Sequence, residues 1–85
     1  MKLIRTEDFA RSLLELPAEI QRFYAAQEKR FKENWRDPRL HIKKMRGLVE
    51  VFSFRVTRRY RVLFYFQNGE NVILFEIDHR KDIYD

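Results

Sequence analysis

The spacing of apolar residues changes along the chain from a helical period to a period of two. In the first part, Phe9, Leu13 and Leu16 recur at positions i, i+4 and i+7, which predicts one face of a helix. Thr6 suits the N-cap of this helix, and Pro17 suits the first position of a second helix. The second helix carries its own stripe on one face: Ile20, Phe23, Tyr24, Gln27 and Phe31.

Beyond Gly47, apolar and polar residues alternate, which is typical of half-buried strands. Three strands are predicted, over Val51–Thr57, Tyr60–Gln67 and Asn71–Asp78. Asn68-Gly69 is a strong hairpin signal, and Lys2-Leu3-Ile4 suits an edge strand before the helices. The order strand, helix, helix, strand, strand, strand predicts an α+β fold. We expect an N-terminal helical hairpin packed on one face of an antiparallel sheet of about four strands.

Length and composition favour a single folded domain over residues 1–85, because 45% of the residues are apolar and 15% are aromatic. Eighteen Lys and Arg against thirteen Asp and Glu give a net charge of +5, which favours an anionic partner. The chain has no Cys, no apolar run of membrane-spanning length and no hydrophobic signal segment at its start. We therefore expect a cytoplasmic protein with no membrane partner.

The usual signatures of cofactor and metal sites are missing from the sequence. Neither Gly stands in a phosphate-binding motif, and the two His residues have no ligand spacing, so neither a cofactor nor a metal is expected. Ser12 and Ser53 lack a nucleophile motif. The remaining candidate chemistry is cationic.

Alternation places Arg55 and Arg61 on the sheet face that we expect the helices to leave uncovered. Polar residues on such a face are ordinary in antiparallel sheets, so the two arginines could be simply solvated. Leu63 and Tyr65, however, share the side of Arg61. A half-apolar face with embedded arginines is equally well interpreted as a binding surface.

The C-terminal tail and a basic stretch add the other parts needed for metal-free phosphodiester cleavage. His79 is suited to carry a proton near neutral pH, and Tyr84 to stack on a base or donate a proton. A solvated tail with Tyr84 packed against the core is an equally good interpretation. Further candidate contacts to the RNA backbone are basic: Lys43, Lys44, Arg58, Arg80 and Lys81.

Four segments together resemble the RelE/ParE toxins of bacterial toxin–antitoxin pairs, and the resemblance covers essentially the whole chain. They are Met45-Arg46-Gly47-Leu48, Phe54-Arg55-Val56, Tyr60-Arg61-Val62-Leu63-Phe64-Tyr65 and His79-Arg80-Lys81-Asp82-Ile83-Tyr84. RelE-like members cut messenger RNA in the ribosomal A site, whereas ParE-like members inhibit DNA gyrase and are not nucleases. The terminal Tyr84 favours the RelE-like branch.

Carried over residue by residue, the resemblance implies four catalytic positions: Arg55, Arg61, His79 and Tyr84. Ser53 stands where the best-known RelE branch has a second basic residue. This departure favours His79 as the residue that carries the proton. The implied activity is a ribosome-dependent, metal-independent mRNA endonuclease that acts through 2′-hydroxyl attack. The alternatives are a gyrase inhibitor without nuclease activity and a non-catalytic RNA-binding relic of the fold.

The resemblance also implies two partners, mRNA on the ribosome and a cognate antitoxin. We expect the antitoxin to be acidic, to wrap the basic surface, and to fold on binding. The residues themselves suggest where it binds: Leu63 and Tyr65 offer apolar anchor points, and Arg55 and Arg61 beside them can pair with its carboxylates. A residual groove along the stripe of residues 20–31 is a further candidate place for its apolar side chains.

Overall fold

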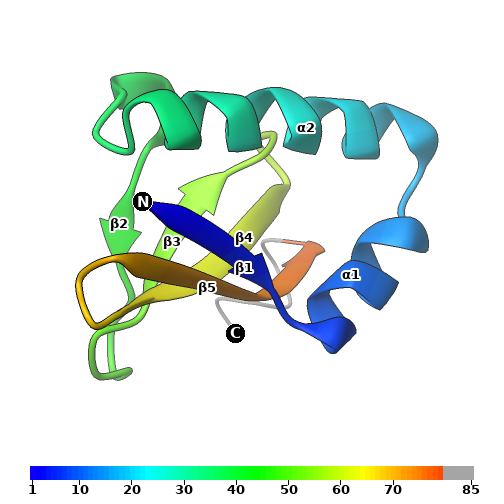
Figure 1. The fold of residues 1–85 in the computed structure, drawn as a ribbon. Helices are drawn as coiled ribbons and strands as arrows, with labels where there is room; N and C mark the ends of the chain where they lie inside the picture. The colour runs from blue at the N-terminus through cyan, green and yellow to red at the C-terminus, as the bar shows by residue number, and fades with distance from the viewer. Residues whose placement is uncertain (80–85) are drawn as a thin grey trace.

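The computed structural model describes residues 1–79, in which two α-helices and a five-stranded sheet form two layers (Figure 1). In chain order the elements are β1 (Lys2–Arg5), α1 (Glu7–Leu14), α2 (Ala18–Glu33), the short 3-10 helix η1 (Pro38–Leu40), β2 (Lys43–Lys44), β3 (Phe52–Arg55), β4 (Tyr60–Gln67) and β5 (Asn71–His79). This arrangement confirms the predicted α+β class with two helices on a sheet.

The sheet differs from the prediction in strand number and in direction. Its order is β1-β5-β4-β3-β2, with β1 parallel to β5 and every other pair antiparallel, so it is a mixed sheet of five strands. The extra strand, β2, is only Lys43–Lys44, which has no apolar residue to signal it. Alternation identifies strands but not their neighbours, so it did not predict the parallel β1–β5 pair.

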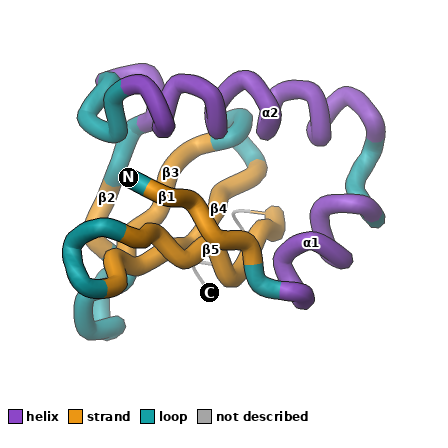
Figure 2. The backbone as a smooth tube through the Cα atoms, in the orientation of Figure 1, coloured by secondary structure: helices purple, strands orange, loops and turns teal. Residues whose placement is uncertain are grey.

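The helix stripes and the sheet meet in an aromatic core. Phe31 of α2 lies with its ring centroid 5.4 Å from that of Phe54 on β3 and 5.1 Å from that of Phe64 on β4. All three side chains are fully buried. Helix α2 therefore covers one face of the sheet, as Figures 1 and 2 show.

The joint between the helices is a corner rather than a tight antiparallel hairpin. Helix α1 packs beside β5, and α2 runs from the corner across the sheet (Figure 2). Thr6 caps α1 as predicted, because its Oγ1 accepts a bond from the Phe9 N–H. At the corner, Gln21 Nε2 donates to the carbonyls of Leu14, the last residue of α1, and of Leu16.

Candidate RNA-contacting face of the sheet

The register of the central strands brings the two predicted arginines together. Arg55 is the cross-strand partner of Arg61, and Arg61 is in turn the partner of Asp78 on β5. Side chains of directly opposed residues project from the same face of a sheet. Val62 and Phe64, which alternate with Arg61, belong to the core under α2, so this row lies on the opposite face.

A second row on the same face crosses four strands. Lys43 pairs with Ser53, Ser53 with Leu63, and Leu63 with Glu76. Tyr65 lies two residues beyond Leu63, and its ring centroid is 5.8 Å from that of Phe75. The face therefore combines cations, carboxylates and apolar side chains, as the alternation predicted for Leu63 and Tyr65.

The burial of Arg61 corrects the expectation that it stands on an uncovered surface. Its side chain is only 1% exposed, whereas Arg55 is partly exposed. Arg61 lies on the central strand β4, where Arg55 and Asp78 flank it on both sides, and alternation does not indicate how deeply a side chain of such a strand is buried. A buried guanidinium needs compensating polar partners, and Asp78 brings a carboxylate to the same face.

His79 ends β5 on the other face of the sheet. It pairs with Tyr60, and the two ring centroids are 5.5 Å apart in an edge-to-face contact. Its backbone N–H donates to Oδ1 of Asp78 at 2.7 Å. The structure thus brings together Arg55 and Arg61 but directs His79 toward Tyr60. The other predicted tail residues lie outside the described residues: Arg80, Lys81 and Tyr84.

The remaining predicted RNA contacts are exposed. Lys43 lies in the row of Ser53 and so shares the face of Arg55, whereas its neighbour Lys44 points to the other side and lies 3.8 Å from Glu50. Arg58 lies in the turn between β3 and β4. Of these cations, Lys43 is therefore the one whose register places it with Arg55.

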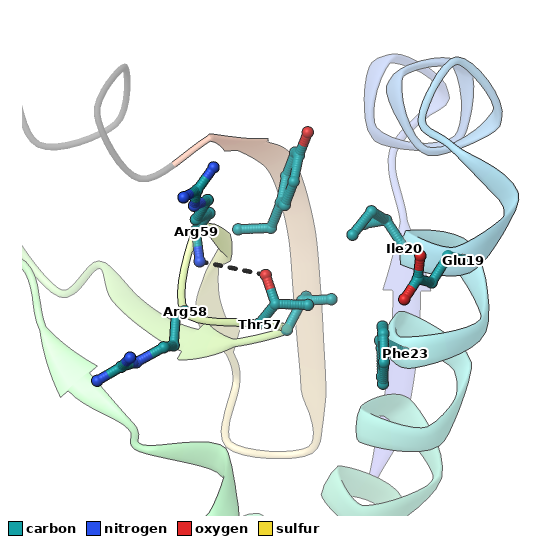
Figure 3. A pocket seen from close by; sticks show the side chains of 8 residues that line it. Glu19, Ile20, Phe23, Thr57, Arg58 and Arg59 are labelled. Atoms are coloured by element: carbon teal, nitrogen blue, oxygen red, sulfur yellow. Dashed lines mark hydrogen bonds between the residues drawn. The ribbon is translucent and has the colours of Figure 1, made fainter.

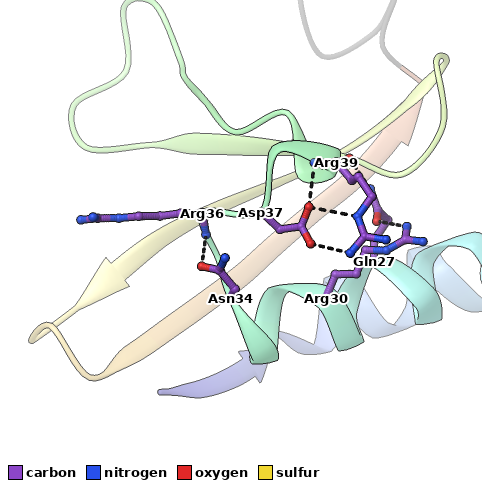
Figure 4. Close-up of polar contacts among 6 residues, drawn as sticks. All are labelled: Gln27, Arg30, Asn34, Arg36, Asp37 and Arg39. Atoms are coloured by element: carbon purple, nitrogen blue, oxygen red, sulfur yellow. Dashed lines mark hydrogen bonds and ion pairs between the residues drawn. The ribbon is translucent and has the colours of Figure 1, made fainter.

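Gln27 was predicted only as part of the apolar stripe of α2, and the structure shows that it bridges three elements. Its side chain is 5% exposed, and Nε2 donates to the carbonyl oxygens of Arg55, at 2.7 Å, and Arg39, at 3.0 Å. Oε1 accepts from Nη1 of Arg30 at 2.7 Å (Figure 4). The signal in the sequence was a polar amide within an apolar stripe, which requires buried partners.

The turn into η1 is held by a local ion pair. Asp37 accepts bonds from the Arg39 backbone N–H at 2.9 Å and from its guanidinium Nε at 3.1 Å (Figure 4). These bonds to the ionised form hold the pKa of the Asp37 carboxyl at about 2. The carbonyl oxygen of Arg39 also accepts a hydrogen bond from Gln27. Asp37 and Gln27 therefore hold both the side chain and the backbone of Arg39 in place.

A groove of about 640 Å³ lies between α2 and the β3–β4 turn (Figure 3). Ile20 and Phe23 form the helix side, and Phe23 is 47% exposed. In Figure 3, Arg58 points away from the helix, whereas the Phe23 ring faces the turn. The other lining residues are Glu19, Val56, Thr57, Arg58, Arg59 and Tyr60.

Among residues 1–79, no group of three or more His, Cys, Asp or Glu residues is placed to hold a metal ion. No helix in this part of the chain is long and apolar enough to cross a bilayer.

This chain resembles known proteins in its three-dimensional structure. No family model and no curated protein matches the chain. The fold is similar to the RelB–RelE antitoxin–toxin complex of Methanococcus jannaschii, with TM-score 0.77, 23% identity and coverage of 96% of this chain and 95% of that one. It is also similar to a YoeB/ParE toxin of Agrobacterium tumefaciens, with TM-score 0.76, 14% identity and coverage of 94% and 99%.

A third solved structure extends the likeness from fold to sequence. The RelBE toxin–antitoxin complex of Mycobacterium tuberculosis contains a chain 30% identical to this one, with TM-score 0.66 and coverage of 93% of this chain and 96% of that one. The match covers nearly the whole of both chains. The chain belongs to the RelE-like toxin superfamily.

Proposed function

We propose that this toxin is a metal-independent endonuclease that cleaves messenger RNA on the ribosome. The observation that carries the proposal is the pairing of Arg55 with Arg61 on the sheet face away from α2, with Lys43 on the same face. Guanidinium groups bind phosphate oxygens in pairs and keep their charge at every physiological pH.

The proposed reaction is an internal transfer at phosphorus. The 2′-oxygen bonds to the adjacent phosphate as its proton leaves to a base, and the bond from phosphorus to the 5′-oxygen breaks as that oxygen gains a proton. The products are a 2′,3′-cyclic phosphate and a 5′-hydroxyl. Arg55 contacts the extra negative charge of the pentacovalent phosphate, and Arg61 supports it from within the sheet.

The proton carriers remain predictions, with His79 and Tyr84 as the candidates. For His79 to act beside Arg55, its ring must leave Tyr60 and reach the other face of the sheet. Single-turnover cleavage as a function of pH tests this role. If His79 carries a proton, the wild-type rate has a pH-dependent limb that His79→Gln flattens. Identical profiles for the two proteins would exclude it.

The direct test is single-turnover cleavage of mRNA by purified protein, with and without programmed ribosomes. We expect cleavage only with ribosomes, and Arg55→Ala to lower its rate by about 10²–10³-fold. Arg11→Ala is the matched control, since Arg11 is an exposed cation of α1 paired with Asp8. Equal activity of Arg55→Ala and the control would contradict the proposal.

Gyrase inhibition is the second candidate function. The edge contact of His79 with Tyr60 favours it, because it holds the candidate proton carrier on the sheet face opposite Arg55 and Arg61. A DNA supercoiling assay with the same protein distinguishes the two. Inhibition of supercoiling without RNA cleavage would replace the nuclease. Tight RNA binding without either activity would indicate a non-catalytic relic.

The proposed protein partner is a cognate antitoxin with an acidic, amphipathic segment that orders on binding. Four of the similar solved structures are antitoxin–toxin complexes, which supports this kind of partner. In this chain, the groove between α2 and the β3–β4 turn is suited to apolar anchors, and Arg58 and Arg59 at its edge are suited to carboxylates.

A further inference from the structure

Strand β3 is longer than its neighbour β2. The backbone of Arg55, at the end of β3, therefore has no part of β2 beside it. Strand β2 pairs only with Phe52 and Ser53, whereas β3 continues to Arg55. The Val56 N–H donates to the Tyr60 carbonyl, so Val56 and Tyr60 are a hydrogen-bonded pair. Such pairs alternate along an antiparallel ladder, and the Arg55 backbone therefore faces outward, away from β4.

The Gln27 amide makes the hydrogen bond to Arg55 that the backbone of a neighbouring strand would otherwise make. Its Nε2 donates to the outward carbonyl of Arg55, and its second proton reaches the carbonyl of Arg39 in η1. Arg30 donates to the amide oxygen and so fixes which way the amide faces. All three of its polar contacts are thus made inside the protein, at a side chain that is 5% exposed.

The two bridged elements both carry cations to the candidate face. Arg55 stands on it directly, and η1 leads within three residues to Lys43, which the Ser53 pairing places on the same face. The single amide thereby fixes the end of β3 relative to the start of the basic segment that leads to β2.

We propose that Gln27 is a positioning residue that acts through Arg55 and sets the spacing between this arginine and Lys43 along a bound RNA backbone. The inference rests on the proposed contact between Arg55 and RNA phosphate. Gln27 itself lies on the α2 side of the sheet and contacts only backbone carbonyls and Arg30. Its effect on RNA must therefore vanish when the Arg55 side chain is absent.

The test is a double-mutant cycle with a second side-chain amide bridge, that of the half-buried Gln21, as its control. Gln27→Met keeps the length of the side chain and removes its donors. Gln21→Met does the same at the α1–α2 corner, where Gln21 also donates to two carbonyls. Each change is made with Arg55 present and in an Arg55→Ala background. Two quantities are measured, the single-turnover cleavage rate on ribosomes and the affinity for a single-stranded RNA oligonucleotide.

We expect Gln27→Met to lower the cleavage rate by about 10–100-fold with little change in half-saturating ribosome concentration, since misplaced groups lose transition-state contacts first. In the Arg55→Ala background, the same change should have no further effect. Gln21→Met should lower only the melting temperature. If Gln27→Met does not fold, Gln27→Asn, which keeps the amide but is too short to bridge both carbonyls, replaces it.

Two outcomes would overturn the inference: equal effects of the Gln27 and Gln21 variants, or an undiminished Gln27 effect without Arg55. A wild-type protein that cleaves no RNA would overturn the proposed nuclease instead. The oligonucleotide cycle then decides the inference separately, because coupling in binding supports it and additivity contradicts it.

Discussion

Arg61 is both a candidate functional residue and a buried side chain that packs within the fold. A buried arginine contributes packing along its stem as well as charge, so its truncation creates a cavity next to Leu63 and leaves Asp78 without a cation opposite. Loss of activity at this position would therefore not by itself identify a phosphate contact. Arg55, which is partly exposed, is the better probe of the chemistry.

Arg61→Ala is expected to lower the free energy of unfolding by about 3 kcal/mol, in the range of large-to-small substitutions at buried sites. Chemical denaturation measures this value. Arg58→Ala removes the same charge from an exposed turn and should change it by less than about 0.5 kcal/mol. An Arg61→Ala protein as stable as this control would show that the arginine is not a packed part of the fold.

Asp37 provides a pH test of the turn that presents Arg39. Because the folded pKa of Asp37 is about 2, below its ordinary value of about 3.9, its contribution to stability is full above pH ~4. It is lost as the pH falls toward 2. Melting temperatures of wild type and Asp37→Asn should therefore differ at pH 6 and converge near pH 2. A difference that is constant over this range would contradict the assignment.

For single residues, the sequence predicted which face of the sheet each side chain lies on, but not how deeply it is buried or what it contacts. Alternation correctly put Arg55, Arg61 and Leu63 on one side, because a period of two is a local property of the strand. The burial of Arg61 depends on contacts between segments distant in the sequence, which alternation does not identify. The direction of His79 depends in the same way on its pairing with Tyr60.

Among the elements, those with local signals were predicted best. The hairpin at Asn68-Gly69 is confirmed, and both residues adopt positive φ, at 54° and 74°. The Thr6 cap agrees with the sequence, and Pro17 separates the two helices as predicted, although it is the N-cap of α2 and not its first residue. Strand β2 and the parallel pairing of β1 depend on contacts between distant segments, and no local pattern of residues specifies them.

The groove beside α2 gives a prediction for partner binding. Phe23→Glu should weaken binding of the antitoxin by about 10–100-fold, because it places a carboxylate at an apolar anchor position that an acidic partner must approach. Stability should change little, since Phe23 is 47% exposed. The dissociation constant of the purified complex measures the effect.

Leu14→Glu is the control for this substitution, because Leu14 is an apolar residue of α1 that is 74% exposed and lies outside the groove lining. It should leave the dissociation constant unchanged. Equal weakening by both variants would indicate that net charge, rather than the groove, governs binding.

For the whole molecule, the net charge of +5 controls encounter with either proposed partner. Association with an acidic antitoxin should slow as salt increases, because ions screen steering between opposite charges, whereas dissociation should change less. Stopped-flow measurements at low and high salt test this. An association rate that does not depend on salt would exclude an acidic partner guided to the basic surface.

The parallel pairing of β1 with β5 has a consequence for how the toxin folds. Among the strands of residues 1–79, β1 comes first in the sequence and its partner β5 comes last. Closing this contact brings together segments about 70 residues apart, and long-range closures of this kind are slow. We therefore expect the β1–β5 contact to form late in folding, after β5 has joined β4.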